Sequence, residues 1–290
     1  MGNRGGLKEF LKALALKAGA ASCAITDAGL SGIFPGLSRV PDCGLPPGLS
    51  YLSRESEKRA DIRKWFPPAE SVLVCAFQYW NSSMKPADFQ PAPGQIAEFL
   101  KGERRRFNRK ITPEYGSAIA RYALSEDYHE TIRDVLREIL KKASGFCPGI
   151  SGKIFVDTSP VMEKPFARAA GLGWQGKNTL LISEKRGSWF FIGGMALSGK
   201  MDPDPPAENR CGTCDLCLRA CPTGALREPG VLDPNLCLSY WTTQHKGDIP
   251  PEIIKRMEGK IYGCDICQEV CPYNSDVIAE VRPEFHPLLT

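Results

Sequence analysis

Residues 211–222 read Cys-Gly-Thr-Cys-Asp-Leu-Cys-Leu-Arg-Ala-Cys-Pro, so four cysteines fall within eleven positions and a proline follows the last. Residues 264–272 read Cys-Asp-Ile-Cys-Gln-Glu-Val-Cys-Pro and end in the same way. Cys237 lies between them, so residues 211–271 hold eight of the twelve cysteines in the chain. Because thiol spacing decides which metal clusters a segment can bind, this stretch decides the fold of the C-terminal part.

The spacing of these cysteines is typical of a bacterial ferredoxin. There a C-x2-C-x2-C run gives three thiolates to one 4Fe-4S cluster, and the cysteine before proline crosses to the other cluster. The second run is one cysteine short, and Cys237 can complete it. The rule predicts two sets of four ligands: Cys211, Cys214, Cys217 and Cys271 for one cluster, and Cys221, Cys237, Cys264 and Cys267 for the other.

Zinc is the alternative metal, because two C-x2-C pairs can form a four-cysteine site. The two C-x3-C-P endings and the total of eight thiols favour two iron-sulfur clusters. Two clusters form an electron relay, so the sequence predicts an oxidoreductase or an electron carrier.

Composition places the chain among ordinary globular proteins. Its 290 residues, 42% of them hydrophobic, suffice for one large and one small domain. The sequence has no apolar run of membrane-spanning length, and its N-terminus lacks a signal peptide's apolar core and a twin arginine, so we expect a cytoplasmic protein without a membrane. The four isolated cysteines are expected to be small buried apolar residues: Cys23, Cys43, Cys75 and Cys147.

Charge is concentrated in one short run. The net charge is only +4, but five cations lie within seven residues: Arg104, Arg105, Arg106, Arg109 and Lys110. Such a run can contact phosphates, although a solvated loop or helix face explains it equally well.

Apolar periodicity predicts alternating helices and strands, an α/β (α+β) pattern. Helices are expected over residues 7–18 and 117–143 and from about residue 158. Strands are expected over residues 21–25, 71–79, 153–156, 179–182 and 189–197. A proline-rich linker at 202–206 then separates a catalytic domain, residues 1–201, from a cluster domain, residues 202–280, with a tail at 281–290.

Two cofactor motifs fail on inspection. Gly171, Gly173 and Gly176 match G-x-G-x-x-G, but a predicted helix precedes them, whereas a dinucleotide site lies between a strand and a helix. A close backbone approach to a bulky cofactor is the better use of these glycines. The corrinoid pattern D-x-H-x-x-G begins at Asp127 but has isoleucine in place of the glycine, and a helix is predicted at His129.

Several stretches resemble one enzyme family. Residues 121–129 read Arg-Tyr-Ala-Leu-Ser-Glu-Asp-Tyr-His, residues 156–163 Val-Asp-Thr-Ser-Pro-Val-Met-Glu, and residues 171–178 Gly-Leu-Gly-Trp-Gln-Gly-Lys-Asn. The cysteine runs follow, with Cys-Leu-Ser-Tyr at residues 237–240 and Ile-Tyr-Gly-Cys at residues 261–264. In order and spacing, over residues 7–274, the chain resembles the epoxyqueuosine reductases, which are similar to reductive dehalogenases.

The resemblance implies a fold, cofactors and a reaction. It implies a nitroreductase-like domain that binds cobalamin without a protein ligand on its lower face, followed by a ferredoxin-like domain with two 4Fe-4S clusters. The implied reaction is two-electron removal of the epoxide oxygen of epoxyqueuosine in tRNA, which gives queuosine. Asp157 matches the proposed proton donor, which the alkoxide left by C–O cleavage requires. An N-cap carboxylate is the alternative role for Asp157.

Further site residues follow from the resemblance alone. Ser239 and the Cys264-Asp265 turn match positions that approach the corrin, which would place the Cys237/Cys264 cluster nearest cobalt. Arg121 matches the segment lining the cobalamin pocket, and Lys177 and Asn178 are expected at the cofactor's amides or tail. Electrons would enter at the other cluster from a low-potential donor such as ferredoxin or flavodoxin. We expect a monomer.

Two departures from the family affect the tRNA. Many members continue into a C-terminal helical-repeat domain that helps grip tRNA, and we expect it to be absent here. Residues 84–110 are longer and more basic than usual, and we hypothesise that they partly replace it. Two other functions stay open: a dehalogenase-like reductase of a small molecule, and an electron carrier that reactivates a corrinoid partner.

Overall fold

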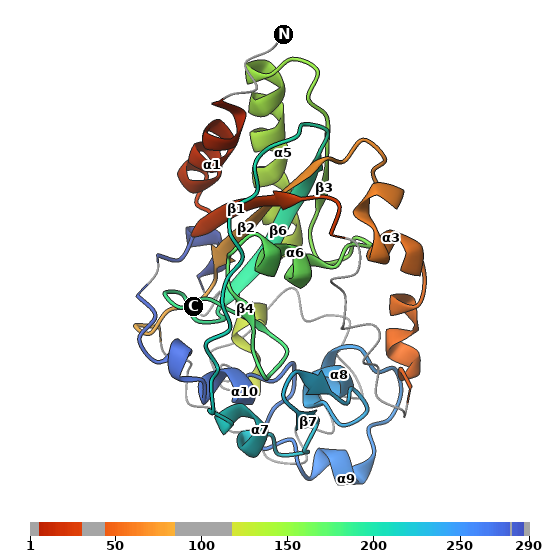
Figure 1. Cartoon of the computed structure of the whole chain (residues 1–290). Helices are drawn as coiled ribbons and strands as arrows, with labels where there is room; N and C mark the ends of the chain where they lie inside the picture. The colour runs from red at the N-terminus through yellow and green to blue at the C-terminus, as the bar shows by residue number, and fades with distance from the viewer. Residues whose placement is uncertain (1–5, 31–43, 85–117, 279, 287–290) are drawn as a thin grey trace.

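The computed structural model describes residues 6–30, 44–84, 118–278 and 280–286. Cys43 and the cationic run at residues 104–110 lie outside the described residues. The described residues form a mixed α/β domain with a smaller, loop-rich region below it in Figure 1. Within them, no helix combines the length and apolar character needed to cross a membrane.

A four-stranded antiparallel sheet forms the centre of the larger domain. Its strands lie in the order β1 (Ser22–Asp27), β2 (Ser71–Gln78), β6 (Phe190–Leu197) and β3 (Gly152–Phe155). All eight residues of β2 are buried, as its nearly continuous apolar sequence predicts for a strand covered on both faces.

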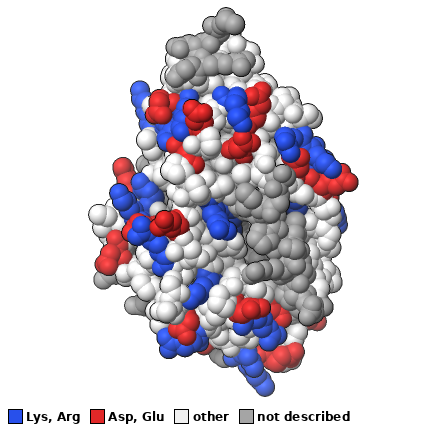
Figure 2. Space-filling model, in the orientation of Figure 1, with Lys and Arg blue, Asp and Glu red and all other residues white. Residues whose placement is uncertain are grey.

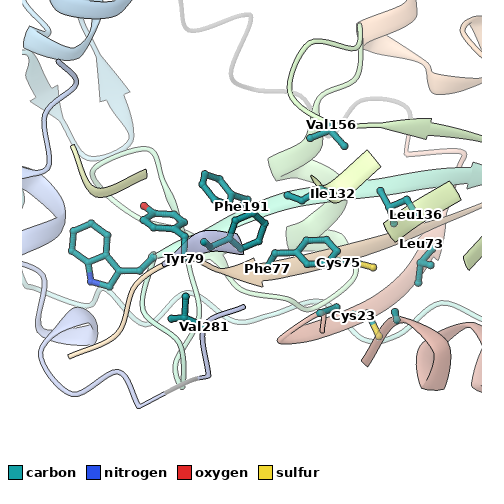
Figure 3. Packing of buried hydrophobic residues seen from close by; sticks show 14 of the residues in the cluster. Cys23, Leu73, Cys75, Phe77, Tyr79, Ile132, Leu136, Val156, Phe191 and Val281 are labelled. Carbon is teal, nitrogen blue, oxygen red and sulfur yellow. The ribbon is translucent and has the colours of Figure 1, made fainter. Parts of the chain in front are cut away.

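Alternate residues of β2 face two different cores. Leu73, Cys75 and Phe77 pack towards α1 (Leu7–Lys17) and α5 (Tyr128–Phe146), as the close view of the core shows (Figure 3). The intervening residues pack towards α6 (Glu163–Ala169) on the opposite face. The period of two along a strand therefore separates the helices into two layers. The isolated cysteines that the structure describes, Cys23, Cys75 and Cys147, are buried, as predicted.

Helix boundaries differ from the prediction where polar residues set them. The helix expected from residue 117 begins only at Tyr128, because the side chain of Asp127 caps it by accepting the His129 N–H at 2.9 Å. A 3-10 turn, η5 (Arg121–Ala123), precedes it. Helix α6 begins at Glu163 and has Met162 at its N-cap.

The N-cap interpretation of Asp157 is therefore wrong. Its φ of +49° is left-handed, whereas an N-cap residue is usually extended, and residues 158–162 form a bend before α6 starts.

The smaller region is built from short elements, as expected when clusters rather than a large core organise the chain. It contains α7 (Leu216–Ala220), the β7/β8 hairpin (Leu226–Glu228 and Val231–Leu232), α8 (Leu238–Thr243), α9 (Pro251–Ile254), α10 (Ile266–Glu269) and η6 (Pro272–Asn274). A second hairpin joins it to the larger domain: β4 (Trp174–Gln175) with β5 (Leu181–Ile182). The remaining elements are η2 (Pro47–Leu52), α3 (Ser56–Ala60), η3 (Ile62–Lys64) and η7 (Pro283–Phe285).

The two regions share one hydrophobic core. A parallel bridge pairs Ile119 with Tyr262, and the Ile261 N–H donates to the Ala118 carbonyl at 2.8 Å. The predicted tail packs as well, because Phe285 is only 1% exposed and its ring meets the Phe191 ring edge-on. The linker is also fixed: Asp204 pairs with two lysines of α1, Lys8 and Lys12.

Candidate functional site

A cavity of about 1200 Å³ lies between the sheet domain and the cluster region. Residues from η5, the start of α5, the β4–β5 connection and β6 line one wall, and residues 221–226, 234–244 and 262–268 contribute to the other. Its volume exceeds the roughly 300–1,000 Å³ of pockets for drug-sized ligands, so it can hold a macrocycle.

Four cysteines lie on the cluster-side wall, and we call them the inner cysteines: Cys221, Cys237, Cys264 and Cys267. Burial raises the pKa of the Cys267 thiol well above its ordinary value, and the neighbouring sulfurs of Cys264 and Cys237 raise it further. This proximity brings together three of the four ligands predicted for one cluster, and Cys221 likewise acts on the pKa of Cys237.

The other predicted ligands, the outer cysteines, also form a group: Cys211, Cys214, Cys217 and Cys271. The described residues that line the cavity do not include them. Burial raises the pKa of Cys217, and Cys211, Cys271 and Cys214 act on it in the same direction. Cys214 is exposed, so this group faces solvent.

The glycine-rich segment, residues 171–178, contacts the part of the chain that carries the outer cysteines. The Trp174 Nε1–H donates to Cys211 Sγ at 3.4 Å. The Lys177 ammonium donates to the Gly212 and Cys214 carbonyls at 2.7 Å each, so it does not lie where the cofactor was expected. A Cβ on Gly173 would lie 2.2 Å from the Ile182 carbonyl oxygen, and one on Gly171 would lie 2.3 Å from the Pro205 carbonyl oxygen, so these two glycines permit close approaches between protein segments.

Asp157 lies on the opposite wall, directly after β3. Its side chain is 58% exposed and lines the cavity. Its backbone N–H donates to Glu163 Oε1 at 2.5 Å. Asp157 and Thr179 are two cavity-lining residues with left-handed backbone, at φ +49° and +68°. Such backbone in a β-branched residue is costly, and strain of this kind often marks functional sites.

His129 lies between two carboxylates. Its Nε2 is 3.1 Å from Asp157 Oδ2, and its Nδ1 is 2.6 Å from Asp127 Oδ1. The hydrogen bond from Asp157 raises the pKa of His129 above its usual value; burial opposes this, and the bond from Asp127 supports it. The Tyr128 ring stacks on the imidazole with centroids 4.0 Å apart. Sequence analysis did not place His129 here, because it put the residue inside a helix predicted from residue 117 rather than in the first turn of α5.

Glu163 adds a carboxyl group behind Asp157. Burial raises its pKa to about 8, and the charge of Asp157 acts in the same direction. The carboxyl is therefore largely protonated at neutral pH, although the residue is partly exposed.

Asp265 and Arg121 connect the two walls. Asp265 lines the cavity and is 3% exposed; its Oδ2 accepts the Arg121 backbone N–H at 2.7 Å. Burial raises the pKa of Asp265, and Arg121 opposes this rise. The guanidinium lies 5.1 Å from the Trp80 ring centroid and 4.7 Å from that of Trp189. Arg121 is not among the described lining residues, so it acts on the cavity through Asp265.

Ser239 and Asn178 were expected at the cofactor, and both line the cavity. Asn178 is buried, and its amide donates to the Cys267 carbonyl at 3.2 Å. Besides His129, sequence reasoning missed several lining residues within or beside the motifs that it used: Tyr122, Tyr128, Thr179, Leu180, Ser188 and Gln268. Their proximity to the motifs was the one available signal.

Comparisons with known proteins agree with this arrangement. Two family descriptions match the chain: "Epoxyqueuosine reductase QueG, DUF1730" over residues 59–158, and "4Fe-4S double cluster binding domain" over residues 210–274. The second decides between iron-sulfur clusters and zinc. A curated epoxyqueuosine reductase of Vibrio cholerae is 33% identical over 280 residues, which cover 97% of this chain and 70% of that protein.

Solved structures show the same fold. A crystal structure of an epoxyqueuosine reductase with an epoxyqueuosine-modified tRNA-Tyr stem loop matches 98% of this chain and 70% of that one, at 28% identity and a TM-score of 0.77. A catabolic reductive dehalogenase matches 92% of this chain and 32% of that one, at 18% identity and a TM-score of 0.52, which confirms the expected relationship in fold. With one third of its residues identical over nearly its whole length, this chain belongs to the epoxyqueuosine reductase family.

Proposed function

We propose that this protein is an epoxyqueuosine reductase, which removes the epoxide oxygen of epoxyqueuosine in tRNA with two electrons and gives queuosine. One observation carries this function within the family: a single large cavity has Asp157 on one wall and the inner cysteines on the other. The cavity can therefore bring a proton donor and an electron source to the same substrate.

The cavity fits cobalamin, which when bound would supply the electron pair that breaks the C–O bond. Its size suits a macrocycle, and Asn178, Ser239 and Asp265 offer polar groups to the periphery. His129 is the histidine among the described lining residues, and both its ring nitrogens face carboxylates. This supports binding without a protein ligand below the metal.

The two cysteine groups would hold the 4Fe-4S clusters as the ferredoxin rule assigns them. The outer cluster, with Cys214 at the surface, would accept electrons from a low-potential ferredoxin or flavodoxin. The inner cluster, whose four cysteines line the cavity, would deliver them. Each thiol must be deprotonated to bind iron, so cluster binding overcomes the raised pKa of buried thiols such as that of Cys267.

Asp157 would donate a proton to the epoxide oxygen as the C–O bond breaks. Its exposed carboxyl points into the cavity while its backbone N–H is held by Glu163, so the donor is accessible and positioned at the same time.

Acidic and basic side chains are interspersed on the face of the molecule that Figure 2 shows. We therefore assign no tRNA-binding patch to the described residues of that face. We place the reaction in the cytoplasm and expect a monomer.

The test is direct conversion. Protein reconstituted anaerobically with iron, sulfide and cobalamin is incubated with epoxyqueuosine-containing tRNA and a low-potential reductant, and the nucleosides are then separated. Queuosine should appear only when both cofactors are present. If no queuosine forms with both cofactors verified as bound, the proposed function is wrong. Turnover of small halogenated compounds by the same preparation would then favour the dehalogenase-like alternative.

A further inference from the structure

We propose that His129 is a positioning residue that stores the second proton of the reaction and passes it to Asp157. This inference rests on the proposed function and adds a residue to it. It assigns a role to the Asp127–His129–Asp157 chain of hydrogen bonds, which the reaction as described so far does not use.

The stoichiometry requires two protons. When an epoxide loses its oxygen, two C–O bonds break, a C=C bond forms and the oxygen leaves as water. The balance is one epoxide, two electrons and two protons, with the electrons coming from a low-potential one-electron donor through the clusters. One carboxyl carries one proton, so Asp157 must be reprotonated within the turnover or a second donor must act.

His129 is placed to reprotonate Asp157. Its Nε2 lies 3.1 Å from Asp157 Oδ2, within hydrogen-bond reach. Its other nitrogen lies 2.6 Å from Asp127 Oδ1, so the imidazolium can donate at both ends. After the imidazolium passes its Nε2 proton to Asp157, the neutral ring keeps its Nδ1–H, which Asp127 Oδ1 continues to accept.

The ring is fixed from several sides. Asp127 cannot swing freely, because its Oδ1 also accepts the His129 backbone N–H at 2.9 Å as the helix cap. Tyr128 stacks on the imidazole and on Phe191, with centroids 4.0 Å apart in each pair. The chain thus has the geometry of a histidine that moves protons, with a carboxylate behind it to orient the ring.

The electrostatic surroundings favour the charged ring. Once Asp157 has given up the first proton, its carboxylate and that of Asp127 raise the pKa of His129, which favours the imidazolium at the step that needs the second proton. The other titratable groups that act on the three members are Tyr51, Tyr122, Glu163 and Lys164 from other elements, and Tyr128 and Arg133 of α5 itself; the Tyr128 side chain hydrogen-bonds Asp157. Glu163 bonds the Asp157 backbone, and Arg133 pairs with Glu130, so neither lies between His129 and Asp157.

The first experiment tests the pair without turnover. The chain has three histidines, His129, His245 and His286, so their ring signals can be assigned by substitution and titrated by NMR in the oxidised, cluster-loaded protein. His129 should titrate above the ordinary value of about 6.5. Its pKa should fall in Asp157→Asn and in Asp127→Asn, while those of the other two histidines stay constant. An unchanged His129 titration in Asp157→Asn would overturn the proposal.

The second experiment measures single turnover of the holoenzyme against pH. His129→Gln should lower the rate by about 100-fold at pH 8, because solvent must then supply the second proton, and the loss should shrink at lower pH. Added imidazole should restore part of the rate. The matched control is His286→Gln, an exposed histidine that is not among the described lining residues, and it should behave as the unsubstituted protein does.

The outcomes separate this inference from the function on which it rests. If the unsubstituted holoenzyme forms queuosine and His129→Gln forms it equally fast at every pH, the function stands and the role of His129 is wrong. A pH-independent loss that imidazole does not relieve also overturns the role, since it indicates structural damage. If the unsubstituted enzyme forms no queuosine, both proposals fail, even if NMR still shows the hydrogen-bonded pair.

Discussion

The two walls of the cavity carry different chemistry. The sheet-domain wall bears groups that exchange protons, Asp157 and His129, and they are joined by hydrogen bonds to one another. The cluster-side wall bears the inner cysteines, which can only serve electrons once they hold iron. The difference teaches that, in the proposed reaction, protons and electrons would reach the substrate from opposite sides of the cavity, so that neither source obstructs the other.

The walls also differ in how they are held. The proton side depends on a strained turn at Asp157 and on the first turn of α5. The electron side is fixed through buried polar contacts, above all Arg121 with Asp265 and Asn178 with Cys267. Substitutions should therefore damage one supply while leaving the other intact.

Loss of a cluster should have the largest effect. Cys267→Ala, on the inner wall, should lower bound iron to about half and abolish queuosine formation with any reductant, because one of the two clusters is lost. Cys214→Ala, in the outer group, should lower iron equally but retain turnover with a small chemical reductant that can reach the inner cluster. Iron analysis and nucleoside analysis measure both effects. Equal loss of activity in both variants would contradict the order of the relay.

Removal of the proton donor comes next. Asp157→Asn should lower turnover by about 10²- to 10⁴-fold, the usual range for general acid catalysis, while both clusters and cobalamin remain bound. Asp134→Asn is the matched control, since Asp134 is an exposed carboxylate of α5 that pairs with Arg137. A protein that only carries electrons would tolerate both changes. That result would contradict the proposed catalytic function, while leaving the difference between the two walls unaffected.

The contact between the walls should dominate stability. Arg121→Met leaves the Asp265 carboxylate buried without its partner, which should cost about 3–5 kcal/mol of unfolding free energy. Adding Asp265→Asn should recover part of this loss, because the unpaired charge disappears. Chemical denaturation of the cluster-loaded protein measures the difference. A loss below about 1 kcal/mol would show that this pair does not hold the walls together.

The smallest expected effect concerns Glu163 and pH. Its pKa is raised to about 8 in the folded protein, so the folded state keeps a proton that the unfolded state loses from pH 4.5 upwards. The free energy of unfolding should therefore fall as the pH rises from 4.5 to 8. Glu163→Gln removes this dependence and should stabilise the protein by about 1 kcal/mol at pH 8 and little at pH 4, a value reduced for partial exposure. If Glu163→Gln changes the free energy of unfolding by the same amount at pH 4 and at pH 8, the raised pKa of Glu163 is contradicted.

The cluster region could be predicted in advance because cysteine spacing carries its own rule, independent of where helices begin. The sheet was also predictable, since apolar runs such as residues 71–79 need cover on both faces. Asp157 was found through a family motif. His129 was not, because the predicted helix began at residue 117 and the apolar pattern gave no sign that Asp127 caps it and so places His129 in the first turn.

Contacts between distant residues were beyond the sequence. Lys177 and Arg121 were expected at the cofactor from the family resemblance, but their side-chain ends reach carbonyls and carboxylates 35 to 148 positions away. No local pattern encodes such a pairing. The close approaches of the neighbouring glycines were equally hidden, since Gly171 meets the Pro205 carbonyl and Gly173 the Ile182 carbonyl.

The backbone bridge between Ile119 and Tyr262 has a consequence for the rate of electron tunnelling, which falls steeply with distance. Main-chain hydrogen bonds on both sides of the bridge join the segment before η5 to the loop before Cys264. These bonds restrict relative motion of the two regions at the point where the inner cysteines line the cavity and would hold their cluster. A constant gap would keep each electron's transit time uniform from one catalytic cycle to the next.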